Sequence, residues 1–268
     1  MKAVHIIIIL FCCASILSCT KEVKLSDLNI QYKDCLVVDG NITTERKEQS
    51  ILLYRSSDLS NTDSLLMESG AVVSITDGDT VISLTEKQKG VYVTNSSYAG
   101  KVNKTYTLKV KLKNSEEYTA SDYLYPSMVI DTMYSIMNNS DYDIYIKVHN
   151  TNKNQGAAVI MNFYANDSLL TANLKDKVLY AKNSFYEKVF SIPASLLKKD
   201  NSHIQVQMNS ISYQMYQYLD DVKNGTIWST EIFSTTQANA RTNISNGGLG
   251  FFSASDVLKK QIVIVKGS

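Results

Sequence analysis

The sequence predicts a mainly β protein made of two β-sandwich-like layers or domains, with one amphipathic helix in its C-terminal half. Three observations support this prediction. Apolar and polar residues alternate with a period of two over most of the chain, turn residues separate short alternating segments, and a single segment has helical spacing. Such alternation is typical of antiparallel strands that are buried on one face.

The N-terminal half contains the clearest predicted strands. In the segment Thr105–Leu112, the apolar residues Tyr106, Leu108, Val110 and Leu112 fall on one face. Further strands are expected at Leu36–Ile42 and Ser50–Arg55. A hairpin is expected across the turn Asp77-Gly78-Asp79, with Val73 and Ile75 in phase with Ile82 and Leu84, and a second turn is expected at Asn114-Ser115-Glu116-Glu117. Six or seven short strands at this spacing predict an immunoglobulin-like or prealbumin-like sandwich over residues 34–124.

A second β-rich domain is predicted over residues 125–268. Pro126 favours a boundary near Ser121–Ser127, because proline restricts the preceding residue to extended backbone and cannot donate to a strand pair. The predicted buried faces are Ile144, Ile146 and Val148, then Val159, Met161 and Phe163, then Ile204, Val206 and Met208, and the predicted closing strand is Gln261–Val265. One elongated domain is the alternative.

One amphipathic helix is predicted near residues 210–224. Ile211, Met215, Leu219 and Val222 recur at spacings of four, four and three, which places them on one helix face. Ser210 or Ser212 is expected to cap its start, and Asn224-Gly225 to end it. The apolar face is expected to cover the second sheet.

The N-terminus reads as a cleaved export signal, residues 1–18. A positive start is followed by the apolar run Ala3–Leu17, which is shorter than the roughly 20 residues of a membrane span. The sequence Ile16-Leu17-Ser18-Cys19 resembles a bacterial lipobox, in which the cysteine sulfur is acylated. An ordinary signal peptide or a short anchor helix is the alternative.

Acylation of Cys19 would anchor the mature chain to a membrane, because two or more acyl chains bind lipid stably. Residues 19–33 are expected to form a flexible tether with a reach on the order of 20 Å. The remaining cysteine of the mature chain, Cys35, begins an apolar segment and is predicted to be a buried small hydrophobe.

Composition and motifs argue against catalysis. The net charge of +1 and the absence of a basic cluster disfavour nucleic-acid binding. His149 and His203 have no second ligand at metal spacing, and Asp220-Asp221 fit a solvated helix better than a paired active site. The segment Asn246–Gly250 lacks the lysine of a phosphate loop, so it is expected to be a turn before core aromatics. We therefore expect no enzyme, no cofactor and no metal.

Aromatic residues near the helix are the candidate ligand or partner contacts. Tyr213, Tyr216 and Trp228, with Tyr218 beside them, carry large amphipathic rings that suit a binding groove. Packing of the helix on a sheet is the alternative role for the same residues.

Four segments in order resemble one family of Bacteroidota lipoproteins. They are the lipobox with Lys21-Glu22, Leu36–Thr43, Ser69–Gly78 and Asn243–Phe252. This set is similar to the outer-membrane lipoproteins catalogued as domain of unknown function 4249, and the resemblance covers nearly the whole mature chain.

The resemblance implies an outer-membrane lipoprotein that accompanies TonB-dependent transporters in nutrient uptake, and it transfers no catalytic residues. Display on the cell surface is expected, with the periplasmic face as the alternative. Asp63-Ser64-Leu65 and Asp167-Ser168-Leu169 resemble O-glycosylation triplets of such bacteria. The leading functional hypothesis is a non-catalytic accessory of an outer-membrane transporter. The second is a structural or adhesive surface module that binds host or matrix material.

Overall fold

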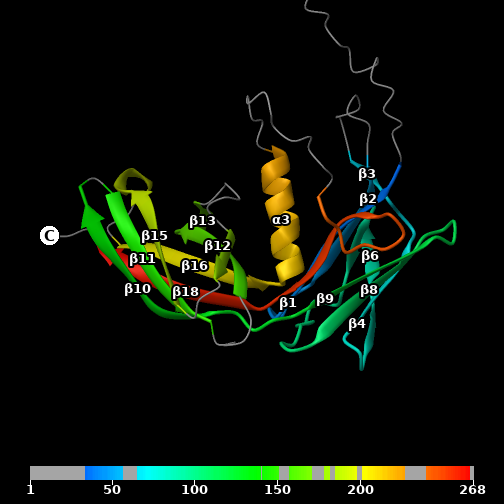
Figure 1. Ribbon diagram of the computed structural model, residues 1–268. Coiled ribbons are helices and arrows are strands. Elements are labelled where there is room, and N and C mark those ends of the chain that lie inside the picture. The colour runs from blue at the N-terminus through cyan, green and yellow to red at the C-terminus, as the bar shows by residue number, and fades with distance from the viewer. Residues whose placement is uncertain are drawn as a thin grey trace, which may run out of the picture. The chain divides into compact units, whose positions relative to one another are not determined.

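The computed structural model describes residues 34–56, 65–139, 141–150, 157–170, 178–181, 185–197, 201–226 and 240–265 (Figure 1). The chain divides into two compact units, Met1–Lys33 and Asp34–Ser268, and every described residue belongs to the second. The predicted signal peptide, Cys19 and the tether therefore lie outside the described residues. Within the second unit the predicted fold class is confirmed, because strands dominate and are arranged in several sheets.

Two sheets form the N-terminal part. The first has the strand order β17-β1-β2-β7-β6 with β3 on β2, and the second has the order β5-β4-β8-β9. The strands of the first are β1 (Leu36–Thr43), β2 (Ser50–Arg55), β3 (Leu66–Met67), β6 (Thr85–Gln88), β7 (Val91–Val93) and β17 (Leu249–Ser255). Those of the second are β4 (Val72–Thr76), β5 (Val81–Ser83), β8 (Thr105–Lys111) and β9 (Glu117–Tyr123).

The buried faces predicted for these strands are confirmed. Tyr106, Leu108, Val110 and Leu112 are all buried in one hydrophobic core, together with the inward residues of β1, β2 and β4. The hairpin across Gly78 has the predicted phase, since Ile75 pairs with Ile82. Burial of this alternating apolar surface is the main stabilising contribution here, at about 25 cal/mol per Å².

Two further sheets form the C-terminal part. The three-stranded sheet has the order β10-β11-β15, and the other has the order β13-β12-β16-β18 with β14 on β12. All nine residues of the three predicted faces, from Ile144 to Met208, are fully buried in a second core. The strands are β10 (Val129–Asn138), β11 (Asp141–His149), β12 (Ala157–Ala165), β13 (Ser168–Leu169), β14 (Val178–Ala181), β15 (Phe185–Pro193), β16 (Asn201–Ile211) and β18 (Val257–Val265).

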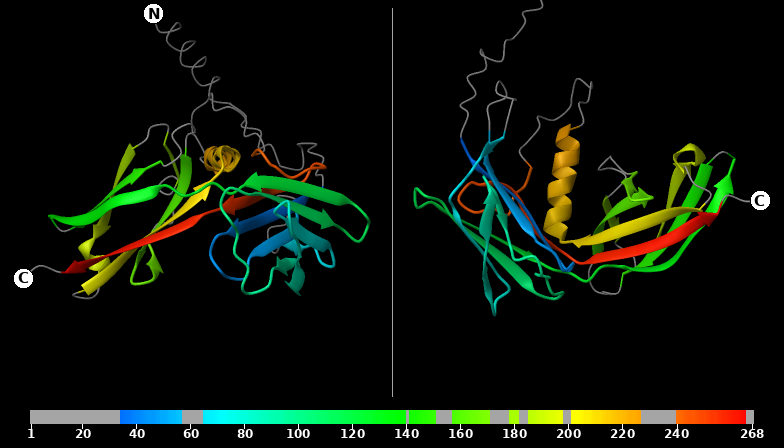
Figure 2. Two further views of the ribbon diagram at one scale, coloured as in Figure 1. Left: turned by 90° about the horizontal axis from the view of Figure 1, so that it is seen from below. Right: turned by 180° about the vertical axis from the view of Figure 1, so that it is seen from behind.

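Strand β17 belongs to the N-terminal sheet although it lies near the end of the chain. It pairs in parallel with β1 from Val37↔Leu249 to Thr43↔Ser255, and Phe252 is buried in the first core. Only Asp256 separates β17 from β18, so one extended segment passes from the first sheet into the second part (Figure 2). The predicted segment 125–268 thus contributes a strand to the N-terminal core.

A hydrogen-bonded junction surrounds this crossing point. The carboxylate of Asp256 accepts the Thr44 hydroxyl at 2.8 Å and the Ser127 backbone N–H at 2.9 Å. The Asp256 backbone N–H donates to the Ser210 hydroxyl, which itself donates to the Tyr125 carbonyl oxygen. These bonds join β1, β16 and the connection after β9 at one residue.

The single described α-helix, α3 (Tyr213–Thr226), confirms the predicted element, and a 3-10 turn, η2, spans Ala194–Leu196. Ser212 is the cap, since its hydroxyl accepts the Met215 backbone N–H at 3.1 Å. The assignment of Ile211 to the helix face is wrong. Ile211 ends β16 and pairs with Ala158, because the strand pairing extends to the cap residue.

Substitution of Gly250 by alanine is expected to destabilise the protein by about 2–4 kcal/mol. Gly250 has a φ of +83°, and an added Cβ would overlap the backbone carbonyl of Val38 on the paired strand. Gly78→Ala is the matched control, because Gly78 has a φ of +94° but open space around it, so only about 1 kcal/mol is expected. Urea unfolding of both variants measures the difference. Equal losses in the free energy of unfolding would contradict the close approach of Gly250 to the Val38 carbonyl.

Asp122 is expected to make stability fall as the pH rises through the range from about 4 to about 6. Burial raises the pKa of Asp122 from 3.8 to about 6, although the carboxylate accepts hydrogen bonds from Ala254 N–H and from Ser212. Because the folded state holds this proton more tightly, ionisation costs up to about 3 kcal/mol above pH 6 and nothing below pH 4. Chemical unfolding of the wild type and of Asp122→Asn at several pH values measures this contribution to the free energy of unfolding. If the two free energies changed with pH in parallel, the contribution of Asp122 would be refuted.

Candidate functional site

Helix α3 carries the candidate contacts predicted from the sequence. It lies against β12, β14 and β17, so it contacts strands of both parts of the unit (Figure 1). Tyr213 and Tyr216 fall within its first turn and Tyr218 within the next, while Trp228 lies outside the described residues.

Tyr180 of β14, Tyr213 and Tyr216 form what we call the tyrosine cluster. Ring centroids are 5.0 Å apart for Tyr180 and Tyr216, 5.5 Å for Tyr180 and Tyr213, and 6.0 Å for Tyr213 and Tyr216. These separations are typical of favourable aromatic pairs. Tyr213 remains 53% exposed, so the cluster presents aromatic surface to solvent as well as packing the helix on β14. The predicted packing role is therefore confirmed for Tyr213 and Tyr216, and their role as ligand or partner contacts stays a prediction.

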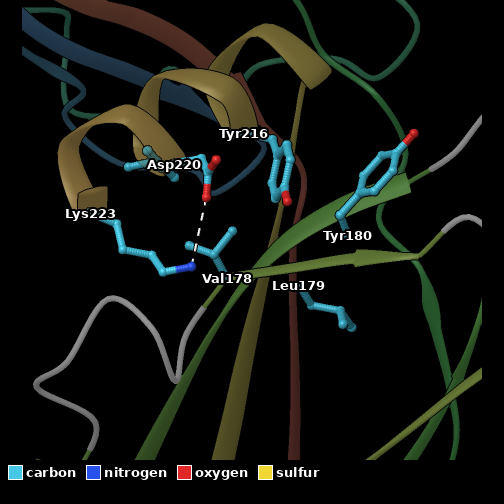
Figure 3. A pocket seen from close by; sticks show the side chains of 7 residues that line it. Val178, Leu179, Tyr180, Tyr216, Asp220 and Lys223 are labelled. Atoms are coloured by element: carbon cyan, nitrogen blue, oxygen red, sulfur yellow. Dashed lines mark ion pairs between the residues drawn. The ribbon is translucent and has the colours of Figure 1, made fainter. Parts of the chain in front are cut away.

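A small pocket of about 170 Å³ lies beside the tyrosine cluster (Figure 3). Asp220 and Lys223, on the next turn of α3, form an ion pair of 3.7 Å at its rim. Burial, followed by the charge of Asp220, raises the pKa of Tyr216, so its phenol stays neutral at physiological pH. Lining residues are Val178, Leu179, Tyr180, Tyr216, Leu219, Asp220 and Lys223.

A larger cavity, which we call the polar pocket, lies beside Met215, Tyr218 and Leu219 of α3, and Leu219 lines both cavities. Its volume is about 330 Å³, within the usual range of small-molecule sites of about 300–1,000 Å³. Its lining residues come from β1, β2, β12, β16, α3 and β17. They are Val38, Asp39, Gly40, Asn41, Tyr54, Ile160, Asn209, Ile211, Met215, Tyr218, Leu219, Gly250, Phe251, Ser253 and Ser255.

One wall of the polar pocket is formed by the first N-terminal sheet, on the face that points away from the first core. The parallel pairing places Asp39 beside Phe251 and Asn41 beside Ser253, on the face opposite the first core. Because successive side chains of a strand point to opposite faces, these polar residues point away from the core. The other wall comes from α3 and the end of β16, and Tyr218 of α3 lies 5.3 Å from Phe251 between ring centroids.

The polar wall contains an acceptor that has no protein partner. Oδ1 of Asn41 is buried and makes no hydrogen bond with any described residue. An unsatisfied buried acceptor costs about 1–3 kcal/mol, so such groups are rare in native structures and call for a physical explanation. Nearby, the Ser253 hydroxyl donates to the Gly40 carbonyl oxygen at 3.4 Å, which leaves its lone pairs as acceptors.

The titratable groups of the polar pocket are an acid and two phenols. Asp39 remains exposed at the mouth, and partial desolvation raises the pKa of its carboxyl group. Burial raises the pKa of Tyr54, and the charge of Asp39 raises it further. The pKa of Tyr218 is raised by burial, then by the charge of Asp39, and then by Tyr54. Both phenols are therefore neutral donors around a carboxylate.

His149 and His203 lie on strands of two different sheets. His149 Nδ1 lies 2.7 Å from Asp131 Oδ1 at the end of β11, and His203 is exposed on the outer face of β16. Among the described residues, no group of three or more His, Cys, Asp or Glu side chains is arranged to hold a metal ion. Cys35 is half-buried rather than fully buried, because it precedes β1 instead of lying within it.

The remaining motifs act structurally. Asp77 accepts backbone N–H groups of Asp79 and Thr80, which fixes the Gly78 turn, and these bonds lower the pKa of Asp77. The glycine-rich segment is a turn, as predicted, and Phe252 is buried in the first core. Phe251 is buried on the opposite face, where it lines the polar pocket instead of the core. Asp221 pairs with Arg241 at 3.1 Å, away from Asp220.

The triplet Asp167-Ser168-Leu169 is exposed at the β12–β13 turn. Of the other triplet, only Leu65 lies within the described residues, where it is exposed. No α-helix of the described part of the chain has the length and apolarity needed to cross a membrane.

Comparison with known proteins places the chain in a family without assigning an activity. No curated protein matches the sequence. A Bacteroides uniformis protein provisionally described as carbohydrate binding is 12% identical over 86% of this chain and 100% of that chain, with a TM-score of 0.24. A chicken TCR is 6% identical over 87% and 100% of the two chains, with a TM-score of 0.29. Likenesses at these TM-scores carry no functional conclusion.

The model of one family, described as "Domain of unknown function (DUF4249)", matches residues 22–261. The match covers most of the chain, and the protein therefore belongs to this family.

Proposed function

We propose that this protein is a lipid-anchored, non-catalytic accessory of an outer-membrane, TonB-dependent nutrient transporter. The lipobox and tether supply the anchor, and the resemblance described above suggests the transporter. The structural observation that carries the proposal is the tyrosine cluster, an exposed aromatic surface on α3.

The chemistry of the tyrosine cluster suits contact with a protein partner. Tyrosine is enriched in interfaces because it supplies a large apolar area at low entropic cost together with a hydroxyl group. Tyr213 is exposed, Tyr216 is held against Tyr180, and the Asp220–Lys223 pair borders the surface. An aromatic centre with a charged rim resembles the usual anatomy of an interface hot spot.

A second candidate function is a surface module that adheres to host or matrix material. It is favoured by an exposed row on the three-stranded sheet, where Tyr134, Tyr145 and Val189 are aligned across β10, β11 and β15. Tyr134 and Tyr145 stack at 5.0 Å, and Tyr134 and Val189 are each nearly half exposed.

Replacement of Cys19 by serine is expected to abolish membrane attachment. A serine hydroxyl cannot replace the sulfur nucleophile that takes the lipid, so the unlipidated chain loses the acyl contribution of about 0.8 kcal/mol per buried CH₂. Fatty-acid labelling and membrane fractionation measure the effect. Cys35→Ser is the control that should keep both properties. Unchanged labelling in Cys19→Ser would refute lipid anchoring.

The double variant Tyr213→Ala/Tyr216→Ala is expected to reduce crosslinking to an outer-membrane transporter at least tenfold, because each lost aromatic anchor costs more than about 1 kcal/mol. Crosslinking of the gently solubilised native protein, followed by mass spectrometry, measures the yield. Tyr134→Ala is the matched control and should leave it unchanged. The reverse pattern would place the transporter contact on the three-stranded sheet and would contradict the role of the tyrosine cluster. An absence of any transporter among the crosslinked proteins would refute the accessory role.

A further inference from the structure

We infer that the polar pocket binds a small, neutral, polyhydroxylated molecule of the size of a mono- or disaccharide. This inference goes beyond the proposed function, because the polar pocket and the tyrosine cluster use different residues of α3. It depends on neither a transporter partner nor the lipid anchor.

The hydrogen-bonding groups of the wall require donors from a ligand. Asn41 Oδ1 is a buried acceptor without a partner among the described residues, and Ser253 has acceptor capacity beyond its bond to Gly40. The exposed Asp39 carboxylate is a third acceptor of the lining. Buried acceptors in proteins are almost always paired, with protein or with ordered water, and a ligand that displaces such water must supply the donors in its place. Hydroxyl groups spaced along a small ring supply several donors at once, which matches acceptors aligned on two paired strands.

The aromatic groups of the pocket can pack against the C–H groups of such a ring. Tyr218 and Phe251 lie 5.3 Å apart between ring centroids, and Tyr54 lies on the same side of β2 as the pocket. Their apolar faces can cover C–H groups while the tyrosine hydroxyls remain hydrogen-bond donors. Phe251 and Tyr54 lie on the same sheet as Asp39 and Asn41, whereas Tyr218 comes from α3, so polar and aromatic groups are interspersed around the pocket. This mixture matches an amphipathic ligand rather than a purely apolar one.

The charge of the lining favours a neutral ligand. Among the described residues that line the polar pocket, Asp39 is the single charged one, so an anion would be repelled and would find no cation among them. A compact cation would pair with Asp39, whereas a polyhydroxylated ring can also donate to Asn41 and Ser253. The volume of about 330 Å³ limits the ligand to about one or two sugar rings.

The test is calorimetric titration of the full-length lipidated protein in a detergent without a sugar headgroup. The probes are glucose, galactose, mannose, maltose and cellobiose, with glucosamine and glucuronate as cationic and anionic rings of the same size. We expect at least one neutral sugar to bind and glucuronate not to bind. Asn41→Leu and Tyr218→Ala are each expected to weaken that binding about tenfold or more, since each removes one contact group.

Tyr213→Ala is the matched control on the same helix, because Tyr213 does not line the polar pocket, and it should retain the affinity of the wild type. Asn41→Leu removes an unpaired group, so its thermal unfolding temperature should not fall, and Ser253→Ala provides a second variant of the same wall. Binding of no neutral sugar, stronger binding of glucosamine or glucuronate than of every neutral sugar, or binding that survives all three pocket variants would each overturn the inference. Loss of transporter crosslinking with intact sugar binding would refute only the accessory role.

Discussion

The parallel pairing of β17 with β1 is the constraint on which the rest of the structure depends. It brings residues 249–255 beside residues 37–43, about 210 positions earlier in the chain, and buries Phe252 in the first core. Gly250 permits this approach, because its backbone lies against the Val38 carbonyl with a positive φ. Since β18 follows after one residue, the same segment then pairs with β16 and joins the second core. The two cores are therefore linked through this extended segment, through the connection from Leu124 to Met128, and through the hydrogen bonds around Asp256.

This pairing also explains where the polar pocket lies. It aligns the outward residues of β1 and β17 into one polar wall, and the short connection from β16 through Ser212 places α3 over that wall. The outer face of a sheet normally meets water, which satisfies its polar groups. Here α3 and the end of β16 cover it, so Asn41 Oδ1 is buried and finds no partner in the described part of the chain. A binding site is a physical reason for retaining such a costly group.

A second buried polar group lies close to the same crossing. Asp122 of β9 accepts the Ala254 N–H of β17 and interacts with Ser212 at the start of α3, and burial raises the pKa of Asp122. Its carboxylate thus ties the second N-terminal sheet to both elements that enclose the polar pocket. Replacement of such a group by an apolar one often stabilises a protein, so its cost is consistent with a role in orienting β17 and α3.

The sequence by itself determined the local features of this protein. Period-two alternation, the Gly78 turn and the Ser212 cap depend on neighbouring residues, and they predicted the buried faces, the hairpin and the helix that the structure contains. Only the tertiary structure decided that β17 pairs with β1, that Ile211 ends a strand, and that Asn41 faces a cavity with Tyr218. A strand carries no local signal for a partner two hundred residues away, and an outward polar residue looks the same whether water or a helix covers it. The tyrosines of α3 were therefore predictable as candidates, whereas the polar pocket was not.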